Sequence, residues 1–387
     1  MRPVLVLIFH ATASPDAGPL VRALAEARGA LAERQRNAFI AVGADAAEII
    51  SGPPDVLSFG ERLAAEMRVR GGAGGLSGTG LSGVGGYVVL DSGAANTGGL
   101  VVLGSGSIPL ARAADLRRFV EVAAGPGGHA IANNRYSADV VAISRAADLA
   151  GLPPLPADNA LPRWLEERAG VAVTDLRSRW RLGVDVDTPL DLILVGDPAA
   201  RDLRATAPLI GERLAALAGV MANSHAELLV AGRVSATTLR WLERGVACRV
   251  RALVEERGLK ASSRLALGAP PGAAASRPPR SILGELLDRD GPESLAAVVA
   301  KLADAAVIDT RVLLAHRAGA DERDWPIAEE RFASDLLLPE PIADPWLRAL
   351  TVSALTDPDD HPILLGGHTL VNGGLHLLAE RARAVAR

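Results

Sequence analysis

Short apolar runs alternate with longer amphipathic stretches through the first half of the chain. Apolar runs of this length suit strands buried on both faces, and the stretches between them repeat apolar residues at helical spacing. Such alternation predicts a mostly parallel β-sheet covered by helices. The predicted strands lie at residues 3–9, 38–42, 87–90, 100–103, 130–132 and 139–143 and in a run that ends at Asp187, and the predicted helices lie at residues 19–36, 60–70, 113–123 and 160–169.

The second half of the chain is predicted to be mainly helical. Amphipathic stretches at residues 205–221, 236–256 and 294–303 repeat apolar residues at helical spacing. A run rich in proline, glycine and alanine at residues 268–279 interrupts them and is typical of an exposed linker. A chain of 387 residues is expected to hold about two domains. The prediction is an α/β domain over residues 1–200 and a mainly α-helical domain of unassigned role over residues 201–387.

Two carboxylates stand where the last predicted strand of the first domain ends, in the sequence LGVDVDTPLDL at residues 182–192. Asp185 and Asp187 are two residues apart, so in an extended chain they share a face, where they attract a hard divalent cation. Thr188 is predicted to cap a helix whose first turn holds a proline, with Asp191 near the positive end of the helix dipole. This combination predicts a phosphate and Mg²⁺ site in which Asp185 and Asp187 are the catalytic and metal-binding residues.

The same segment resembles the GT-A type nucleotidyltransferases, in particular the guanylyltransferase-like branch that acts on molybdenum cofactor or 2-phospholactate. In that family a D-x-D-T-P-x-D-L segment closes the nucleotide domain. Residues 99–110 are similar to the family's second landmark, an apolar strand followed by Asp-x-Pro, but Ser107 stands where the family has its magnesium-binding Asp. Residues 132–142 and 156–159 also resemble family segments. The nucleotide-binding residues that the resemblance implies are Ser105, Ser107, Asn133, Asn134, Asp158 and Asn159.

The N-terminus departs from the family pattern. The glycine-rich G-G-x-S-x-R-M loop that wraps the nucleotide phosphates is replaced by HATASPDAG at residues 10–18. The phosphate-gripping lysine has no counterpart, because the lysines of this chain are Lys260 and Lys301. An arginine can take that place, although its planar fork is not a point charge. The arginines of the corresponding region are Arg22, Arg28, Arg34 and Arg36.

The resemblance implies a nucleotide-diphospho-sugar-transferase-like fold and transfer of a nucleoside monophosphate. The donor would be an NTP, with GTP or CTP favoured, and the acceptor a small phosphorylated or acidic molecule, with Mg²⁺ neutralising the developing phosphate charge. Two alternatives stay open. Ser107 and the absent lysine favour a catalytically degenerate nucleotide-fold protein that acts in binding or assembly. The D-x-D motif also occurs in glycosyltransferases that use sugar nucleotides.

Glycine-rich turns mark two further segments. Residues 78–83 match G-x-G-x-x-G, but a strand is predicted after them where the dinucleotide fingerprint requires a helix. The surrounding residues 71–86 are therefore predicted to be an exposed loop, with a lid over phosphates as the alternative. His368 follows two glycines in a tight turn and is a candidate general acid–base or phosphate donor. The alternative is a histidine hydrogen-bonded inside its own turn.

Charged and polar residues of the second half suggest local structural roles. Asp309 and Arg311 are predicted to form an ion pair, and so are Arg331 and Asp335, which are four apart on a helical face. Residues 232–245 superficially resemble a helix-turn-helix module, but the spacing is more typical of a capped core helix.

Composition excludes several kinds of partner. A net charge of −4 and a pI near 6.0 provide no basic field for nucleic acid or an anionic membrane. The apolar run at residues 3–9 is too short to span a membrane and is followed by no cleavage signal, which predicts a cytoplasmic protein. Cys248 is the single cysteine, which excludes an internal disulfide and is expected to be a buried thiol. In the binding or assembly alternative, the helical half is expected to supply a homo-oligomer interface or a docking surface.

Overall fold

The computed structural model describes residues 2–53, 62–63, 65–66, 98–149, 152–153, 155, 160–255, 279–356 and 361–385. The loop predicted at 71–86, the strand predicted at 87–90 and residues 268–278 of the predicted linker lie outside these residues. The chain divides by its contacts into two compact units. Unit 1 comprises residues 1–12, 29–182 and 259–270, and unit 2 comprises residues 13–28, 183–258 and 271–387. The predicted domain boundary at residue 200 stays a prediction.

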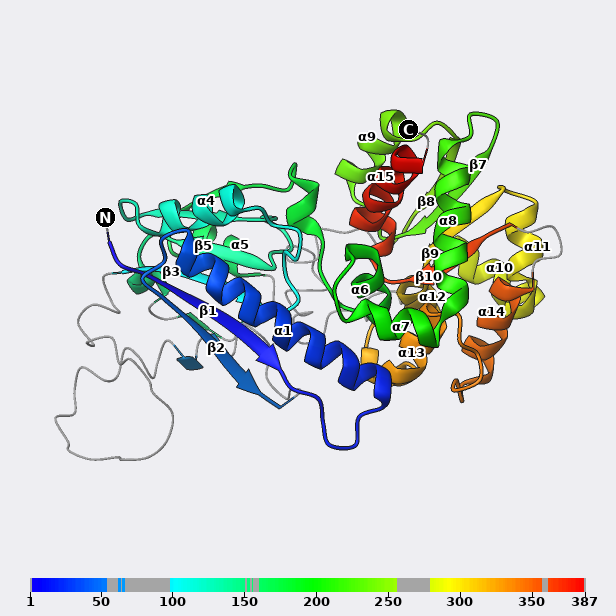
Figure 1. Cartoon of the computed structure of the whole chain (residues 1–387), viewed down its shortest axis with the longest axis horizontal. Helices are drawn as coiled ribbons and strands as arrows, with labels where there is room; N and C mark the ends of the chain where they lie inside the picture. The colour runs from blue at the N-terminus through cyan, green and yellow to red at the C-terminus, as the bar shows by residue number, and fades with distance from the viewer. Residues whose placement is uncertain are drawn as a thin grey trace, which may run out of the picture. The chain divides into compact units, whose positions relative to one another are not determined.

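Unit 1 is built on a six-stranded sheet with the order β2-β1-β3-β5-β4-β6. Strand β5 runs antiparallel to both of its neighbours, whereas the other pairs are parallel. Helices flank this sheet, so the predicted α/β class with a mostly parallel sheet is confirmed (Figure 1). The strands are β1 (Val4–Ala11), β2 (Ala46–Gly52), β3 (Gly99–Gly104), β4 (His129–Ala132), β5 (Val140–Ile143) and β6 (Ala172–Asp175), and the helices include α1 (Pro19–Ala41), α4 (Ala113–Ala123) and α5 (Leu161–Glu167).

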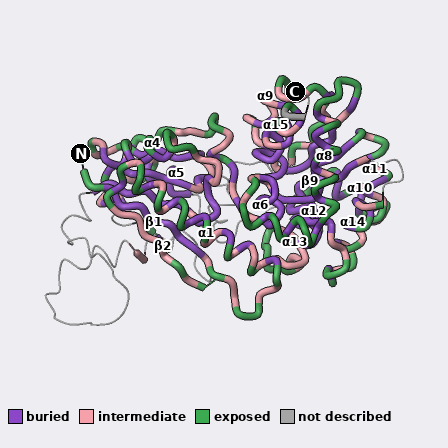
Figure 2. Tube along the Cα trace, in the orientation of Figure 1, coloured by how far each residue is buried: buried purple, intermediate pink, exposed green. Residues whose placement is uncertain are grey.

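Strand β1 shows how the sheet separates two hydrophobic cores. Its side chains alternate between faces, so Leu5 and Leu7 join one buried cluster and Val4 and Val6 join the other. All of these side chains are at most 8% exposed. A central strand covered on both faces needs a continuous apolar sequence, which is why residues 3–9 were recognisable as a strand. Figure 2 shows buried residues, in purple, along the central strands.

The prediction of a strand at residues 38–42 is wrong. Helix α1 continues through these residues to Ala41, because Phe39 is completely buried and extends the apolar stripe of the helix. Gly43, with a φ of 109°, ends the helical path, and the second strand begins at Ala46 instead. The two units divide within α1, between Arg28 and Gly29.

Unit 2 contains a four-stranded parallel sheet with the order β10-β9-β7-β8. The strands are β7 (Glu227–Gly232), β8 (Arg249–Val254), β9 (Ala305–Asp309) and β10 (Ile363–Gly366). The three strands β7, β9 and β10 are almost entirely buried, which requires helices on both faces. The helices are α6 (Pro189–Val195), α7 (Ala200–Thr206), α8 (Pro208–Ala222), α9 (Ala236–Gly245), α10 (Ile282–Asp290), α11 (Leu295–Ala300), α12 (Thr310–Ala318), α13 (Ala328–Asp335), α14 (Pro345–Leu355) and α15 (Leu375–Val385).

The prediction of a mainly helical second half therefore missed a sheet. The stretch 236–256, predicted as one helix, is helix α9 followed by strand β8. Strand β8 is an edge strand with exposed arginines, so its sequence lacks the continuous apolar run that marks a buried strand. Helices α8 and α11 confirm the predictions at 205–221 and 294–303.

No single helix in the described residues combines the length and apolarity that crossing a membrane requires. Helices α7 and α8 meet that test together, but they are bent by 99° relative to each other. Cys248 is a free, buried thiol, as predicted.

Candidate functional site

The two predicted carboxylates lie on a short extended segment at the start of residues 183–258, the second stretch of chain in unit 2. Its residues alternate in burial: Val184 and Val186 are completely buried, and Asp185 and Asp187 are partly exposed. As predicted, the carboxylates lie on one side of the chain. The predicted strand is wrong, because the short helix η2 (Trp180–Gly183) precedes the segment and Asp185 forms only an isolated bridge.

Thr188 caps helix α6 as predicted. Its hydroxyl accepts a hydrogen bond from the Asp191 amide at 3.3 Å. In return, the Asp191 carboxylate accepts from the amides of Asp187 and Thr188 at 3.0 and 2.8 Å. This reciprocal capping box holds the backbone of Asp187 against the start of the helix.

Asp191 is itself an unusual carboxyl group. It is 1% exposed, and one of its oxygens, Oδ1, has no hydrogen-bond partner among the described residues. Burial and, to a smaller extent, the nearby charge of Asp187 together raise the pKa of Asp191 to about 7. The group therefore exchanges its proton near neutral pH, directly beside the predicted site.

Asp187 is engaged by two basic side chains from distant parts of unit 2. Arg28 Nη2 donates to Asp187 Oδ1 at 2.9 Å, and His368 Nδ1 lies 3.7 Å from Asp187 Oδ2. The three side chains are between 29% and 40% exposed, so a ligand can reach them. Arg28 Nε is a buried donor with no hydrogen-bond partner among the described residues. The structure thus brings together Asp187 and His368, both predicted as site residues, and Arg28, one of the four arginines near the replaced phosphate loop.

His368 is positioned by the turn that follows β10. The side-chain amide of Asn372 donates to the carbonyl oxygens of His368 and Arg233 at 2.7 and 3.0 Å. Its carbonyl oxygen accepts from the Ser235 amide at 2.7 Å. Asn372 therefore ties the turn after β10 to the loop after β7, at the edge where the parallel strands end.

Two ion pairs with completely buried carboxylates lie at the same end of the sheet, with partners other than those predicted. Asp309, the last residue of β9, pairs with Arg233 at 2.7 Å and not with the side chain of Arg311. Arg311 instead forms a two-pronged pair with Asp335, with its Nη2 at 2.7 Å from Oδ2. The predicted pair of Asp335 with Arg331 is also wrong, because Arg331 pairs with Glu322 at 2.9 Å.

Gly232, at the end of β7, makes this arrangement of strand ends possible. Its φ is 130°, and a Cβ atom there would lie 2.3 Å from the Cβ of Asp309. We expect Gly232→Ala to lower the free energy of unfolding by about 2–3 kcal/mol, through backbone strain and displacement of Asp309. Urea denaturation measures this loss. Gly319→Ala is the matched control, because Gly319 also has a positive φ but has nothing within 4 Å; equal losses in both variants would contradict the close contact.

Ser105 and Ser107 lie in unit 1, after the end of β3. Both are buried, and the Ser105 hydroxyl lies 3.1 Å from His10 Nδ1 at the end of β1. The carbonyl oxygen of Ser107 accepts a hydrogen bond from the amide of Gln35. These contacts hold the two serines inside unit 1 at the carboxyl ends of its central strands.

The predicted asparagines also make local contacts in unit 1. Asn133 is 1% exposed and donates to the carboxylate of Asp139 at 2.7 Å and to the carbonyl of Leu182 at 2.9 Å. Asn134 accepts from the amide of Tyr136 at 3.0 Å, which forms a tight turn. Asn133 therefore serves to join strand ends. The predicted residues Asp158 and Asn159 lie outside the described residues.

The N-terminus of α1 is a feature that sequence reasoning missed. The Leu20 amide donates to Oε1 and the Val21 amide to Oε2 of Glu329, which comes from α13, both at 3.0 Å. Amides at the start of a helix that follows a strand are where nucleotide folds hold phosphate. Here a side chain of the protein supplies the anion. No local sequence signal could have revealed it, since the partners are 309 and 308 residues apart.

Comparison with known proteins found no family model, curated protein or solved structure that matches the chain. The fold and the site define an α/β protein with two sheets and a cluster of charged residues at the carboxyl edge of the second sheet.

Proposed function

We propose that this protein binds a nucleoside triphosphate and transfers its nucleoside monophosphate to a small phosphorylated or acidic acceptor. The observation that carries the proposal is the cluster of Arg28, Asp187 and His368, in which a buried donor of Arg28 has no hydrogen-bond partner among the described residues. The Arg28 side chain as a whole is 29% exposed, and a phosphate oxygen is a suitable acceptor for its guanidinium donors. The finer fold assignment, nucleotide-diphospho-sugar-transferase-like, is part of this proposal.

The position of the cluster supports a ligand site. In open α/β sheets, ligands bind beyond the carboxyl ends of the strands, where the strand order reverses. In unit 2 the chain passes from β7 to β8 on one side and then to β9 on the other, so the reversal lies between β7 and β9. Arg233 and Asp309 lie at these two strand ends, and His368 follows the end of the next strand, β10.

The proposed reaction requires charge and positioning more than a protein nucleophile. An acceptor oxygen attacks the α-phosphorus, and the bond from that phosphorus to the departing pyrophosphate breaks. Arg28 and protonated His368 would stabilise the negative charge on the phosphates, and Asp187 would hold both side chains in place. His368 can also accept the proton of the attacking hydroxyl when it is neutral.

The residues at this site do not form a resident Mg²⁺ site. One oxygen of Asp187 is bound by the cationic Arg28, and the other faces His368. Among the described residues there is no group of three or more His, Cys, Asp or Glu side chains able to hold a metal. The predicted Mg²⁺ dependence stays a prediction, which titration with Mg²⁺ and with EDTA tests.

A second function, nucleotide or phosphate binding without transfer, is favoured by Glu329. Its carboxylate takes the amides at the N-terminus of α1 that would otherwise be available to a phosphate. A protein that fills one anion position with its own side chain can keep a nucleotide fold and use it for binding or assembly. Pyrophosphate release separates the two functions, because only transfer breaks the phosphoanhydride bond.

Calorimetric titration with GTP, CTP, ATP, UTP and a UDP-sugar, each with Mg²⁺ and with EDTA, tests the proposal. We expect one NTP to bind, and pyrophosphate to be released when an acidic acceptor is added. Binding without release would favour the second function, and binding of the UDP-sugar alone would favour glycosyl transfer. No binding of any of these compounds would contradict the nucleotide site.

Arg28→Gln tests the cluster itself. We expect this variant to bind the NTP about tenfold more weakly, which corresponds to about 1.4 kcal/mol, because a charge-assisted hydrogen bond to phosphate is lost. Arg22→Gln is the matched control, since Arg22 is an exposed arginine on the same helix. Equal weakening in both variants would show that only the general charge of the helix matters.

A further inference from the structure

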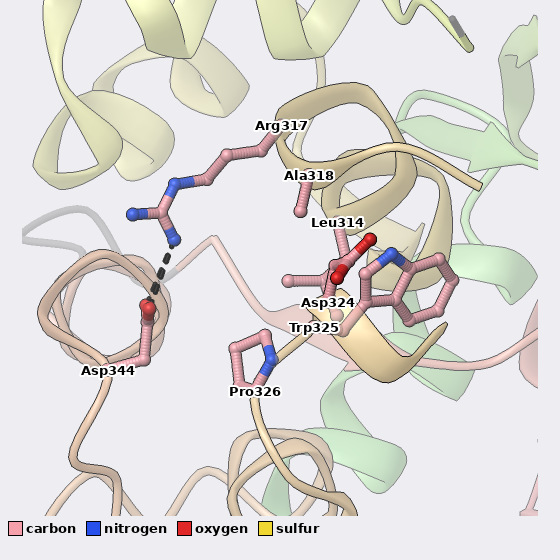
Figure 3. Close-up of a pocket in the computed structure, with 7 residues that line it drawn as sticks. All are labelled: Leu314, Arg317, Ala318, Asp324, Trp325, Pro326 and Asp344. Carbon is pink, nitrogen blue, oxygen red and sulfur yellow. Dashed lines mark hydrogen bonds and ion pairs between the residues drawn. The ribbon is translucent and has the colours of Figure 1, made fainter. Parts of the chain in front are cut away.

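We propose that a pocket on unit 2 binds a small organic cation, a guanidinium or primary ammonium group on a short apolar stem. The pocket has a volume of about 410 Å³ and lies between helix α12, the turn before α13 and the start of α14 (Figure 3). This volume falls within the range of small-molecule sites. Its apolar lining consists of Leu314, Ala318, Trp325 and Pro326.

The charges of the lining favour a cation. Arg317 Nη1 contacts both oxygens of Asp344, at 3.2 and 3.1 Å, so these two charges compensate each other. Asp344 also caps α14, because its carboxylate accepts a hydrogen bond from the Leu347 amide at 2.7 Å. The side chain of Asp324 makes no hydrogen bond or ion pair within the described part of the chain, although its backbone amide donates to the Asp321 carbonyl at 3.1 Å. With one arginine and two aspartates, the lining therefore carries a net charge of −1.

The neighbouring arginine in the sequence, Arg323, interacts mainly with Asp321 and less with the charge of Asp324. Arg323 directs its guanidinium to Asp321, with Nε at 3.0 Å from Oδ1, and both of these side chains are exposed. Asp324 therefore remains available to a ligand cation at the pocket wall. An ammonium or guanidinium group is the complementary partner, since both provide several donors to a carboxylate.

Trp325 supplies a fixed surface beside this carboxylate. Its indole N–H donates to the Gly319 carbonyl at 2.8 Å, which holds the ring in place. The ring already attracts one guanidinium, because Arg331 Cζ lies 5.5 Å from its centroid. In Figure 3, Asp324 and Trp325 lie together on one side, and Arg317 and Asp344 lie on the other. A short apolar stem fits along the aromatic and aliphatic lining while its cationic head reaches Asp324.

Titration of the full-length protein with agmatine, which carries a guanidinium and an ammonium group on a four-carbon stem, tests the proposal. The readout is the indole N–H signal of Trp325 in ¹⁵N-labelled protein, assigned with Trp325→Phe. We expect saturable binding with a Kd of about 1 mM, weakened about tenfold by Asp324→Asn. Asp321→Asn is the matched control, because it removes the same charge from the same turn outside the pocket lining.

Unchanged binding in Asp324→Asn, equal weakening in both variants, or no shift of the Trp325 signal would overturn the proposal. Both substituted residues are exposed, and circular dichroism verifies that the variants fold. A blocked Gly-Arg-Gly peptide distinguishes two sources of the same chemistry. Binding as tight as that of agmatine indicates an arginine side chain of a peptide, and preference for agmatine indicates a free amine; either result supports a cation site.

Discussion

Replacing Asp335 with alanine is expected to lower the free energy of unfolding by about 3–5 kcal/mol, the largest loss among the substitutions considered. Asp335 is completely buried, and it holds the guanidinium of Arg311, whose side chain is 9% exposed. Burial alone would lower the pKa of Arg311, but the carboxylates of Asp335 and Asp309 outweigh burial and raise it. The variant therefore leaves a charged guanidinium buried without its counter-ion. Urea denaturation followed by circular dichroism measures the loss.

A double variant distinguishes the broken pair from the loss of packing. Asp335→Leu combined with Arg311→Met removes both charges and keeps apolar volume, so we expect it to recover most of the lost stability. Asp321→Asn is the control, because it removes a carboxylate from an exposed pair and is expected to leave the unfolding midpoint unchanged. A double variant as unstable as Asp335→Ala would contradict the role of the buried charge.

Asp191→Asn is expected to stabilise the protein increasingly as the pH rises from about 4 to 7. The pKa of Asp191 is raised to about 7 in the folded protein, chiefly by burial and also by Asp187, against an ordinary value of 3.8. At pH values between these two pKa values, the folded state binds more protons than the unfolded state. The contribution of Asp191 to stability therefore decreases as the pH rises. At full effect this decrease is about 1.4 kcal/mol per pH unit.

Asparagine removes the titration and keeps the cap. Its carbonyl oxygen can replace Asp191 Oδ2, which accepts from the amides of Asp187 and Thr188. Urea denaturation at a series of pH values compares the two proteins. Asp187→Asn is the control for the second cause, because loss of that charge should lower the pKa of Asp191 and move the decrease to lower pH. Parallel stability curves for wild type and Asp191→Asn would show that the carboxyl does not titrate in this range.

Interactions between residues near in sequence were predictable. The cap of α6 depends on Thr188 and on Asp191 three residues later, so a local pattern contains all of it. Helix α4 was predicted with its observed bounds, since its apolar face repeats within eleven residues. The alternation that places Asp185 and Asp187 on one side follows from an extended backbone, whether or not a neighbouring strand is present.

Elements that depend on a neighbour were less visible. Strand β8 is recognisable mainly by its pairing with β7, because its edge position tolerates arginines that interrupt an apolar run. Strand β2 contains only two large apolar residues, Ile49 and Ile50, and owes its position to parallel pairing with β1. The apolar residues 38–41, predicted as part of a strand, belong to helix α1, which buries Phe39.

The sequence by itself determined the α/β class of the first half, the capped start of α6 and the side of the chain on which its carboxylates lie. The tertiary structure alone decided the partners of the charges. Arg28 and Asp187 are 159 residues apart in the sequence. Arg311 pairs with Asp335, although Asp309 is nearer in the sequence. Charged side chains carry no pattern that specifies a distant partner. Their pairing depends on which strand ends and helix starts the fold brings within a few ångströms, where burial makes an unpaired charge costly.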